Sequence, residues 1–295
     1  MNTVGEVGEA ALLARLLPYL DTEGYPISAG EDDAASWISK GGLRVASTDA
    51  SVEGVHFDLG WMPPEAAGWR AMALALGDLA AKGARPEVAL VSLALPSAWP
   101  VESVTGFYEG FSGLARKVGM ALLGGDTCAT AGPAVITLTV IGSTDRPSLP
   151  RSAARPGWGI GLTGPLGSAA LALRDRRVLR LEPRLEEGRR LNGLGLCCGD
   201  ISDGLFREME KFLVMAGTGC RIQRDLIPRA EGADWELALG SGEEAELVCV
   251  GPPALLVEAG LFVVGELTAG GQVEVLDAAG RILDVFDRGY QHFGG

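Results

Sequence analysis

The sequence predicts a two-domain protein of the α/β or α+β class. Helical and strand patterns alternate along the chain, which is typical of a sheet covered by helices. The 295 residues are enough for one large domain or two of ordinary size, and the 47% of hydrophobic residues can fill a core. A proline-rich stretch at residues 143–157 separates two halves, so we expect domains at residues 1–145 and 146–295.

The first half is expected to begin with a helix and to continue as a strand. Apolar residues at helical spacing predict the helix over residues 4–20, and a turn followed by a strand is expected over residues 41–48. Residues 64–83 are rich in Ala and Leu between start and stop signals, which predicts a helix buried nearly all round. The elements expected next are a strand at 88–95, a helix at 101–118, and strands at 120–123 and 134–141.

The second half repeats this alternation, with no short repeat of solenoid period. The 43 glycines follow no G-X-Y period, so we expect them in turns and at close backbone contacts. The expected elements are a strand at 159–163, helices at 166–174, 185–191 and 204–216, and strands at 246–250, 262–267 and 273–276.

The net charge excludes some classes of partner. A formal charge of −13 and a pI of about 4.7 argue against nucleic-acid and anionic-membrane binding, which need clustered Lys and Arg. A polyanionic substrate would therefore need metal cations. Apolar strings such as residues 88–95 are much shorter than the ~18 residues of a membrane helix, and the first 20 residues do not resemble a secretory signal, so we expect a cytoplasmic protein.

The five cysteines form an odd set without a C-x-x-C motif. This pattern indicates neither a disulfide framework nor a zinc site. We expect all of them to be small core residues: Cys128, Cys197, Cys198, Cys220 and Cys249.

Aspartates beside glycine or small residues are the most informative feature. Each alone could be a turn or helix-cap residue, and Asp203 is a natural N-cap for the helix that follows it. Asp78 differs because it lies inside an apolar helix, where its alternative role is an i,i+4 pair with Lys82. Together they suit Mg²⁺, which carboxylates bind alongside substrate phosphates. The set is Asp32, Asp33, Asp49, Asp78, Asp126, Asp200 and Asp203.

The usual phosphate-binding signatures are weak or absent. No P-loop motif occurs. A G-x-G-x-x-G pattern is present at residues 159–164, but it lies within an expected strand. It could be the dinucleotide site of an NAD-dependent oxidoreductase, or its glycines could allow close packing of the strand. In residues 123–127, LGGDT, a glycine pair could present backbone N–H groups to phosphate while Asp126 holds a metal; the alternative is a tight turn between strands. His56 could share a site with Asp49, seven residues earlier, or be a structural or surface histidine.

Eight motifs in order carry a resemblance to a known family. They are EDDAA (31–35), STDASVEGVHF (47–57), GWRAMALALGDLAAKGARP (68–86), LGGDT (123–127), RSAARPG (151–157), DISDGL (200–205), GSGEEAEL (240–247) and RGYQHF (288–293). The chain resembles the thiamine-monophosphate kinases nearly end to end.

The resemblance implies both a fold and a reaction. The fold is that of the aminoimidazole ribonucleotide synthetase superfamily, with an N-terminal mixed sheet that forms a barrel across a homodimer and a C-terminal α+β domain that completes the nucleotide site. The reaction is direct transfer of the γ-phosphoryl group of ATP to thiamine monophosphate, giving thiamine diphosphate and ADP. Phosphoryl transfer needs mainly positioning and charge neutralisation, which Mg²⁺ ions on carboxylates and an arginine supply.

The same resemblance assigns roles to residues of this sequence. Mg²⁺ ions would be held by Asp33 or its neighbour Asp32 and by Ser47, Thr48, Asp49, Asp78, Asp126, Asp200 and Asp203. ATP would be contacted by Gly125, Asp126, Arg151 and Ser202, with Tyr108 as a further candidate. Thiamine phosphate would be contacted by His56, Glu243 and Tyr290. The catalytic set would be Asp49, Asp78, Asp126, Arg151 and Asp203.

Three motifs depart from the family pattern. Glu31 replaces a glycine, residues 75–77 read Ala-Leu-Gly where the family has Asn-x-Ser, and Ala245 replaces an aromatic residue near the substrate. The alternatives are therefore a related ATP-binding enzyme with another acceptor and a nucleotide-binding relative without catalysis. Selenophosphate synthetases and hydrogenase-maturation dehydratases are disfavoured, because no cysteine precedes Cys128 and the chain ends in HFGG.

Overall fold

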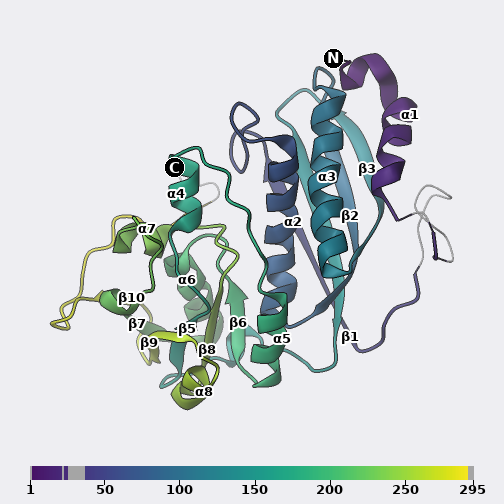
Figure 1. Ribbon diagram of the computed structural model, residues 1–295. Coiled ribbons are helices and arrows are strands. Elements are labelled where there is room, and N and C mark those ends of the chain that lie inside the picture. Colours follow the sequence, from purple (N-terminus) through teal and green to yellow (C-terminus); the bar gives the residue numbers. More distant parts are fainter. Residues whose placement is uncertain (1, 22, 26–36, 292–295) are drawn as a thin grey trace. The chain divides into compact units, whose positions relative to one another are not determined.

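A computed structural model describes residues 2–21, 23–25 and 37–291 (Figure 1). The chain divides into two compact units. The first is Met1–Leu79 with Arg85–Asp145, and the second is Ala80–Ala84 with Arg146–Gly295. Each contains a mixed sheet and helices, so the expected α/β or α+β class is confirmed. Within the described ranges, no helix has the length and apolar character needed to cross a membrane.

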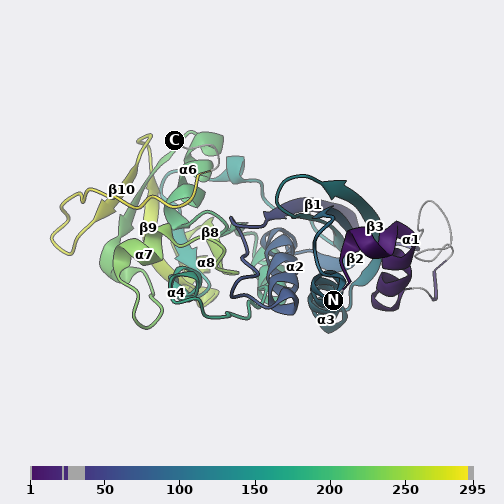
Figure 2. The ribbon, with the colours of Figure 1, turned by 90° about the horizontal axis from the view of Figure 1, so that it is seen from above.

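The first unit contains a four-stranded sheet in the order β1-β4-β2-β3. Its strands are β1 (Leu43–Val52), β2 (Arg85–Pro96), β3 (Ala121–Thr130) and β4 (Val135–Thr144). β4 pairs antiparallel with β1 and β2, and β2 pairs parallel with β3. Figure 2 shows α2 (Pro64–Ala81) and α3 (Val101–Val118) on one face of this sheet, with α1 (Val4–Leu16) near β3. The 3-10 turn η1 (Leu17–Tyr19) follows α1.

Two glycines bring α2 and α3 together. A Cβ atom on Gly68 would lie 2.3 Å from the carbonyl oxygen of Phe107, and one on Gly110 would lie 2.2 Å from that of Glu65. Only glycine permits so close an approach of two backbones. Helix α2 is largely buried, as the sequence predicts, and Leu76 is fully buried.

The second unit contains a six-stranded sheet in the order β10-β7-β9-β5-β8-β6. Helix α6 covers it with Met209 and Phe212, which are fully buried in the core. The strands are β5 (Gly159–Leu162), β6 (Cys197–Asp200), β7 (Gly219–Gln223), β8 (Leu247–Gly251), β9 (Phe262–Thr268) and β10 (Val273–Leu276). The helices are α4 (Ser168–Arg174), α5 (Leu185–Gly193), α6 (Leu205–Ala216), α7 (Trp235–Gly240) and α8 (Pro253–Glu258), with 3-10 turns η2 (Arg151–Ala153) and η3 (Arg224–Leu226).

The G-x-G-x-x-G pattern serves packing. β5 lies between β8 and β9, so its first two glycines are inside a sheet instead of in a strand-to-helix turn. A Cβ atom on Gly159 would lie 2.8 Å from Leu256, and one on Gly161 would lie 3.0 Å from Leu261. The close-packing interpretation is confirmed, and the basis for an NAD-dependent oxidoreductase is lost.

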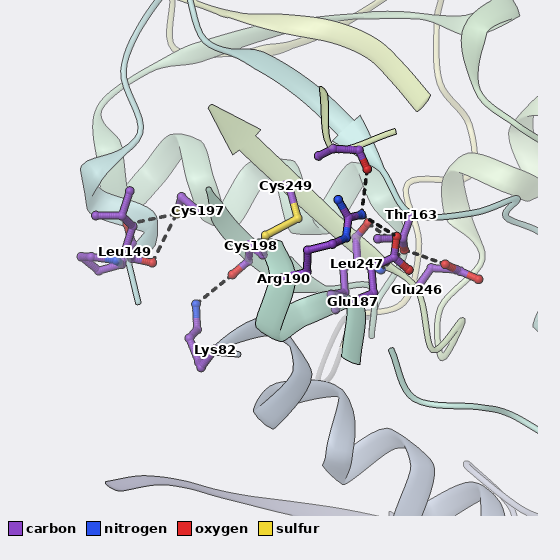
Figure 3. Close-up of a disulfide and its surroundings, with 12 residues drawn as sticks. Lys82, Leu149, Thr163, Glu187, Arg190, Cys197, Cys198, Glu246, Leu247 and Cys249 are labelled. Carbon is purple, nitrogen blue, oxygen red and sulfur yellow. Dashed lines mark hydrogen bonds and ion pairs between the residues drawn. A yellow bond between two sulfur atoms is a disulfide. The ribbon is translucent and has the colours of Figure 1, made fainter. Parts of the chain in front are cut away.

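The cysteines differ from expectation. Cys197 and Cys220 are buried core residues as predicted, but Cys128 is exposed and Cys198 forms a disulfide with Cys249 (Figure 3). The reason is the pairing of β6 with β8, which places these two residues opposite each other with their Cα atoms 4.1 Å apart. A separation of 51 residues in sequence gives no sign of this register.

Candidate active site

A cavity of about 620 Å³ in the first unit brings three predicted nucleotide residues together. Leucines of α1 and η1 line it, together with Tyr108 and residues 123–127 of β3, which include Gly125 and Asp126. Burial raises the pKa of the Tyr108 hydroxyl well above its ordinary value, so this group is a proton donor at neutral pH. The volume and mainly apolar walls with a few polar groups are typical of a small-molecule site.

The glycine pair in this wall forms a β-bulge. The register between β2 and β3 shifts between Ala89 and Val91, so that Val91 pairs with Gly125. Gly124 has a φ of +130°, and a Cβ atom on Gly125 would lie 1.6 Å from the Val91 carbonyl oxygen. Both positions require glycine. The expectation of a strand ending at residue 123 is therefore wrong, as is the alternative of a turn between strands, because β3 continues to Thr130.

Asp78 faces β1 from inside α2. The Ser47 hydroxyl donates a short hydrogen bond to Asp78 Oδ2. Asp49 lies two residues beyond Ser47, so its side chain projects from the same face of the strand. Thr48 projects from the other face, where its hydroxyl lies 3.1 Å from that of Thr139. Three of the four predicted metal ligands on these two elements thus share one face.

Asp126 lies apart from this group within one chain. β1 and β3 are the two edges of the sheet, and the register runs from Asp49 through Leu138 and Val91 to Gly125. Asp49 on β1 and Gly125 on β3 are therefore separated by three strand spacings, or roughly 14 Å across the sheet. Asp126 pairs with Ser92, whose side chain projects from the opposite face to Val91. In the described part of the chain, no three His, Cys, Asp or Glu side chains form a group that could hold a metal.

His56 lies in the turn that follows β1. Its Nδ1 accepts a hydrogen bond from the backbone N–H of Val52 at 3.1 Å, and the Gly54 N–H donates to the Phe57 carbonyl at 2.8 Å. The ring is therefore oriented by the local backbone. Asp32 and Asp33 lie outside the described residues.

The second unit assembles another part of the predicted site where β6 leads into α6. Ser202 and Asp203 lie in this connection. Asp203 does not cap the helix as expected: Gly204 occupies the N-cap position without a side-chain hydrogen bond, and Asp203 Oδ2 accepts one from Lys211 Nζ at 2.9 Å. Burial lowers the pKa of Lys211, but the carboxylates of Glu208 and Asp203 outweigh this effect and leave its pKa raised.

Arg151 reaches the same connection from η2. Its Nη2 donates to Glu208 Oε2 at 3.0 Å, and its guanidinium carbon lies 5.5 Å from the centre of the Phe212 ring. A Cβ atom on Gly199 would lie 2.8 Å from Nη2, so glycine there leaves room for the guanidinium.

Two further segments bring the predicted substrate residues to this connection. The Glu243 N–H donates to the Ser202 carbonyl at 2.7 Å, and the Tyr290 N–H donates to the Asp203 carbonyl at 3.0 Å. Gly289, with a φ of +90°, is required before Tyr290, because a Cβ atom there would lie 2.1 Å from the Asp203 carbonyl oxygen. The backbone thus places Ser202, Asp203, Glu243 and Tyr290 together.

Glu244 and Glu208 are site-supporting residues that the sequence analysis did not single out. The Glu244 carboxylate is buried and accepts hydrogen bonds from the backbone N–H groups of Gly167 and Ala169, at 2.8 and 3.1 Å. It also accepts from the hydroxyls of Ser168, at 2.6 Å, and Ser241. No local pattern marks either glutamate, because donors far away in the sequence, Gly167 for Glu244 and Arg151 for Glu208, account for their burial.

The predicted metal ligands have the donor chemistry that Mg²⁺ requires. Ser47, Asp49 and Asp78 offer hydroxyl and carboxylate oxygens on one face, and hard divalent cations prefer oxygen ligands. Asp200 ends β6, two residues before Ser202. These residues fit a magnesium-bound polyphosphate better than a soft metal, which would require thiolate or imidazole ligands.

Comparison with known proteins identifies the family. Residues 30–144 match the family model described as AIR synthase related protein, N-terminal domain. The thiamine-monophosphate kinase of Synechococcus elongatus is 31% identical over 99% of this chain and 98% of its own, and that of Bacillus subtilis strain 168 is 34% identical over 73% and 75%. A solved structure named "AaThiL complexed with AMPPCP and TMP" is 26% identical, covers 98% of both chains and superimposes with a TM-score of 0.76. The chain belongs to the thiamine-monophosphate kinase family.

Proposed function

We propose that this protein transfers the γ-phosphoryl group of ATP directly to thiamine monophosphate, giving thiamine diphosphate and ADP. The observation that carries the proposal is the full-length similarity to thiamine-monophosphate kinases, at 31% identity over 99% of the chain. The similarity to a structure complexed with AMPPCP and TMP supports the same pair of substrates. The cavity that joins Tyr108, Gly125 and Asp126 supports the assignment of these residues to ATP.

The residues of the first unit would bind and orient the nucleotide. Tyr108 and the bulge at Gly125 form one wall of the cavity, where a protonated phenol and a side-chain-free backbone can meet polar groups of the ligand. Ser47, Asp49 and Asp78 would hold Mg²⁺, as would Thr48, Asp126, Asp200, Asp203 and one of Asp32 and Asp33. Bound Mg²⁺ would supply neutralisation of phosphate charge.

The residues of the second unit would complete the site. Arg151 brings a positive charge and Ser202 a hydroxyl for phosphate oxygens, and both are held by Glu208. Glu243 and Tyr290, with His56 of the first unit, would contact thiamine monophosphate. Its phosphate is already ionised near neutral pH, so the attacking oxygen needs no strong general base. The chain's task is then to align the two phosphates and exclude water.

We also infer that the protein works as a homodimer. β1 and β3 are edge strands with backbone groups that no strand of the described chain pairs, which suits association with a second copy. A barrel formed across that dimer would account for metal ligands placed at both edges of one sheet. A monomeric mass by light scattering at micromolar concentration would contradict this inference. The cytoplasmic location expected from the sequence stays a prediction.

The test of the proposed function is a direct assay. Purified protein is incubated with ATP, Mg²⁺ and thiamine monophosphate, and thiamine diphosphate and ADP are separated by chromatography, with a control that lacks thiamine monophosphate. Equal amounts of both products are expected. ATP binding without product would instead favour another acceptor or a non-catalytic relative, to which the departure at Ala245 already draws attention.

A further inference from the structure

Glu208 lies on α6 with its carboxylate completely buried. The exposed fraction of its side chain is 0%. A buried carboxylate is costly unless it is paired and hydrogen-bonded. Here Oε2 accepts from Arg151 Nη2 at 3.0 Å, while Oε1 accepts from the Ser202 hydroxyl at 3.3 Å and from Lys211 Nζ. Both oxygens are therefore occupied by donors.

These donors connect Glu208 to the predicted nucleotide site. Arg151 and Ser202 are assigned to ATP, and Lys211 also contacts Asp203, an assigned metal ligand, at 2.9 Å. The Glu208 carboxylate thus contacts Arg151 and Ser202 directly, and it is connected to Asp203 through Lys211. The formal charges of Arg151, Lys211, Glu208 and Asp203 sum to zero, so the group is balanced only while Glu208 is present.

The arrangement fixes the guanidinium, while 19% of the Arg151 side chain stays exposed. Phe212 packs on one side of Arg151, and the absence of a side chain at Gly199 leaves space for Nη2. Arg151 Nε is buried and has no hydrogen-bond partner among the described residues.

We propose that Glu208 is a positioning residue of the nucleotide site: it holds the Arg151 guanidinium and the Ser202 hydroxyl in the orientation that meets the ATP phosphates, and through Lys211 it holds the Asp203 carboxylate in the orientation that would bind Mg²⁺. The inference rests on the proposed function for the identity of the ligand. The role of Glu208 would be preorganisation: side chains that are fixed before binding lose less entropy when the ligand binds.

The test compares the wild type with Glu208→Gln and with a matched control, Glu210→Gln. Glu210 lies on the same helix and forms an ion pair with Arg207 at 2.7 Å near the surface. KM values for ATP and for thiamine monophosphate are measured separately, each with the other substrate saturating. We expect Glu208→Gln to raise KM for ATP at least ~10-fold. Without the charge of Glu208, the buried ion pair with Arg151 is lost, and Arg151 is no longer held in the orientation that binds ATP. KM for thiamine monophosphate should stay within about twofold in both variants.

The split between KM and kcat separates positioning from folding. A substitution that only unfolds part of the sample lowers kcat and leaves both KM values unchanged; that result, or wild-type constants throughout, overturns the proposal. If Glu208→Gln does not fold, Glu208→Asp is the second variant, because it keeps the charge but is one methylene too short to reach all three donors. A raised KM for ATP in that variant supports the proposal, and an unchanged one overturns it.

A further measurement separates this inference from the proposed function. If the wild type does not phosphorylate thiamine monophosphate, the proposed function fails. Binding of a non-hydrolysable ATP analogue with Mg²⁺ is then measured by calorimetry on wild type and Glu208→Gln. A dissociation constant at least ~10-fold higher in the variant supports the positioning role, and equal constants, or no binding by the wild type, overturn it.

Discussion

Replacing Glu244 by alanine should destabilise the protein strongly without removing any group that touches a substrate. The buried carboxylate accepts four hydrogen bonds, two of them from the backbone N–H groups of Gly167 and Ala169 at the start of α4. A buried donor left without a partner costs ~1–3 kcal/mol. The hydroxyls of Ser168 and Ser241 can rotate toward other acceptors, so the two N–H groups dominate.

The expected loss is about 4 kcal/mol of unfolding free energy, or a fall in Tm of about 10 °C for a unit of this size. Glu244→Gln keeps the shape and one acceptor oxygen, and should lose only about 1–2 kcal/mol because charge-assisted bonds become neutral ones. Thermal unfolding followed by circular dichroism measures both variants.

The adjacent residue provides a matched control. Glu243 has a φ of +56°, and Ala245 shows that alanine is accommodated in this loop at a similar φ of +43°. Glu243→Ala should therefore change Tm by less than about 2 °C, while raising KM for thiamine monophosphate if Glu243 contacts that substrate. The reasoning is refuted if Glu244→Ala melts within about 2 °C of the wild type, or if Glu243→Ala is destabilised as much.

Three other predictions follow from the structure. Asp49→Asn should lower kcat at least ~100-fold at saturating Mg²⁺, since it removes one metal-binding charge, and near-normal turnover would remove Asp49 from the catalytic set. Thiol titration of the denatured, unreduced protein should find three free thiols among the five cysteines, because Cys198 and Cys249 are joined; five would contradict that pairing. At pH 8, alkylation of the native protein followed by mass spectrometry should modify exposed Cys128 and spare Cys220, because burial raises the pKa of the Cys220 thiol to about 12.

The sequence predicts long periodic elements well and short ones poorly. The helix at residues 101–118 agrees with the structure at both ends. Among the short elements, the strand at 273–276 was predicted at both ends, but others were not. β6 and β7 were missed, because runs of four and five residues rich in Cys and Gly carry too little periodicity to identify. The six-residue helices α7 and α8 were missed for the same reason. Such elements form because tertiary packing stabilises them.

Long-range pairing explains the errors at the candidate site. Asp203 has the sequence context of an N-cap, but Lys211 lies two turns along α6 and its ammonium provides a stronger partner than a backbone N–H. The glycine pair at residues 124–125 has the composition of a turn, yet the carbonyl of Val91, from a strand more than 30 residues earlier, makes it a bulge. Local patterns identify which residues are unusual, whereas the partner that decides their role comes from elsewhere in the chain.

The loop with the altered motif shows how such a partner can impose a conformation. Glu243 and Ala245 both have left-handed backbone angles, which are unfavourable for residues with a side chain. Glu244 lies between them. Its buried carboxylate accepts hydrogen bonds from the start of α4, and its backbone N–H donates to the Ile201 carbonyl. These bonds hold the segment in place. The conformation therefore depends on Glu244 and not on the side chain at position 245. If an aromatic residue at this position packs against the substrate in relatives, as the resemblance implies, alanine should change that packing while leaving the Glu243 backbone beside Ser202. An altered acceptor preference is therefore compatible with an intact nucleotide site.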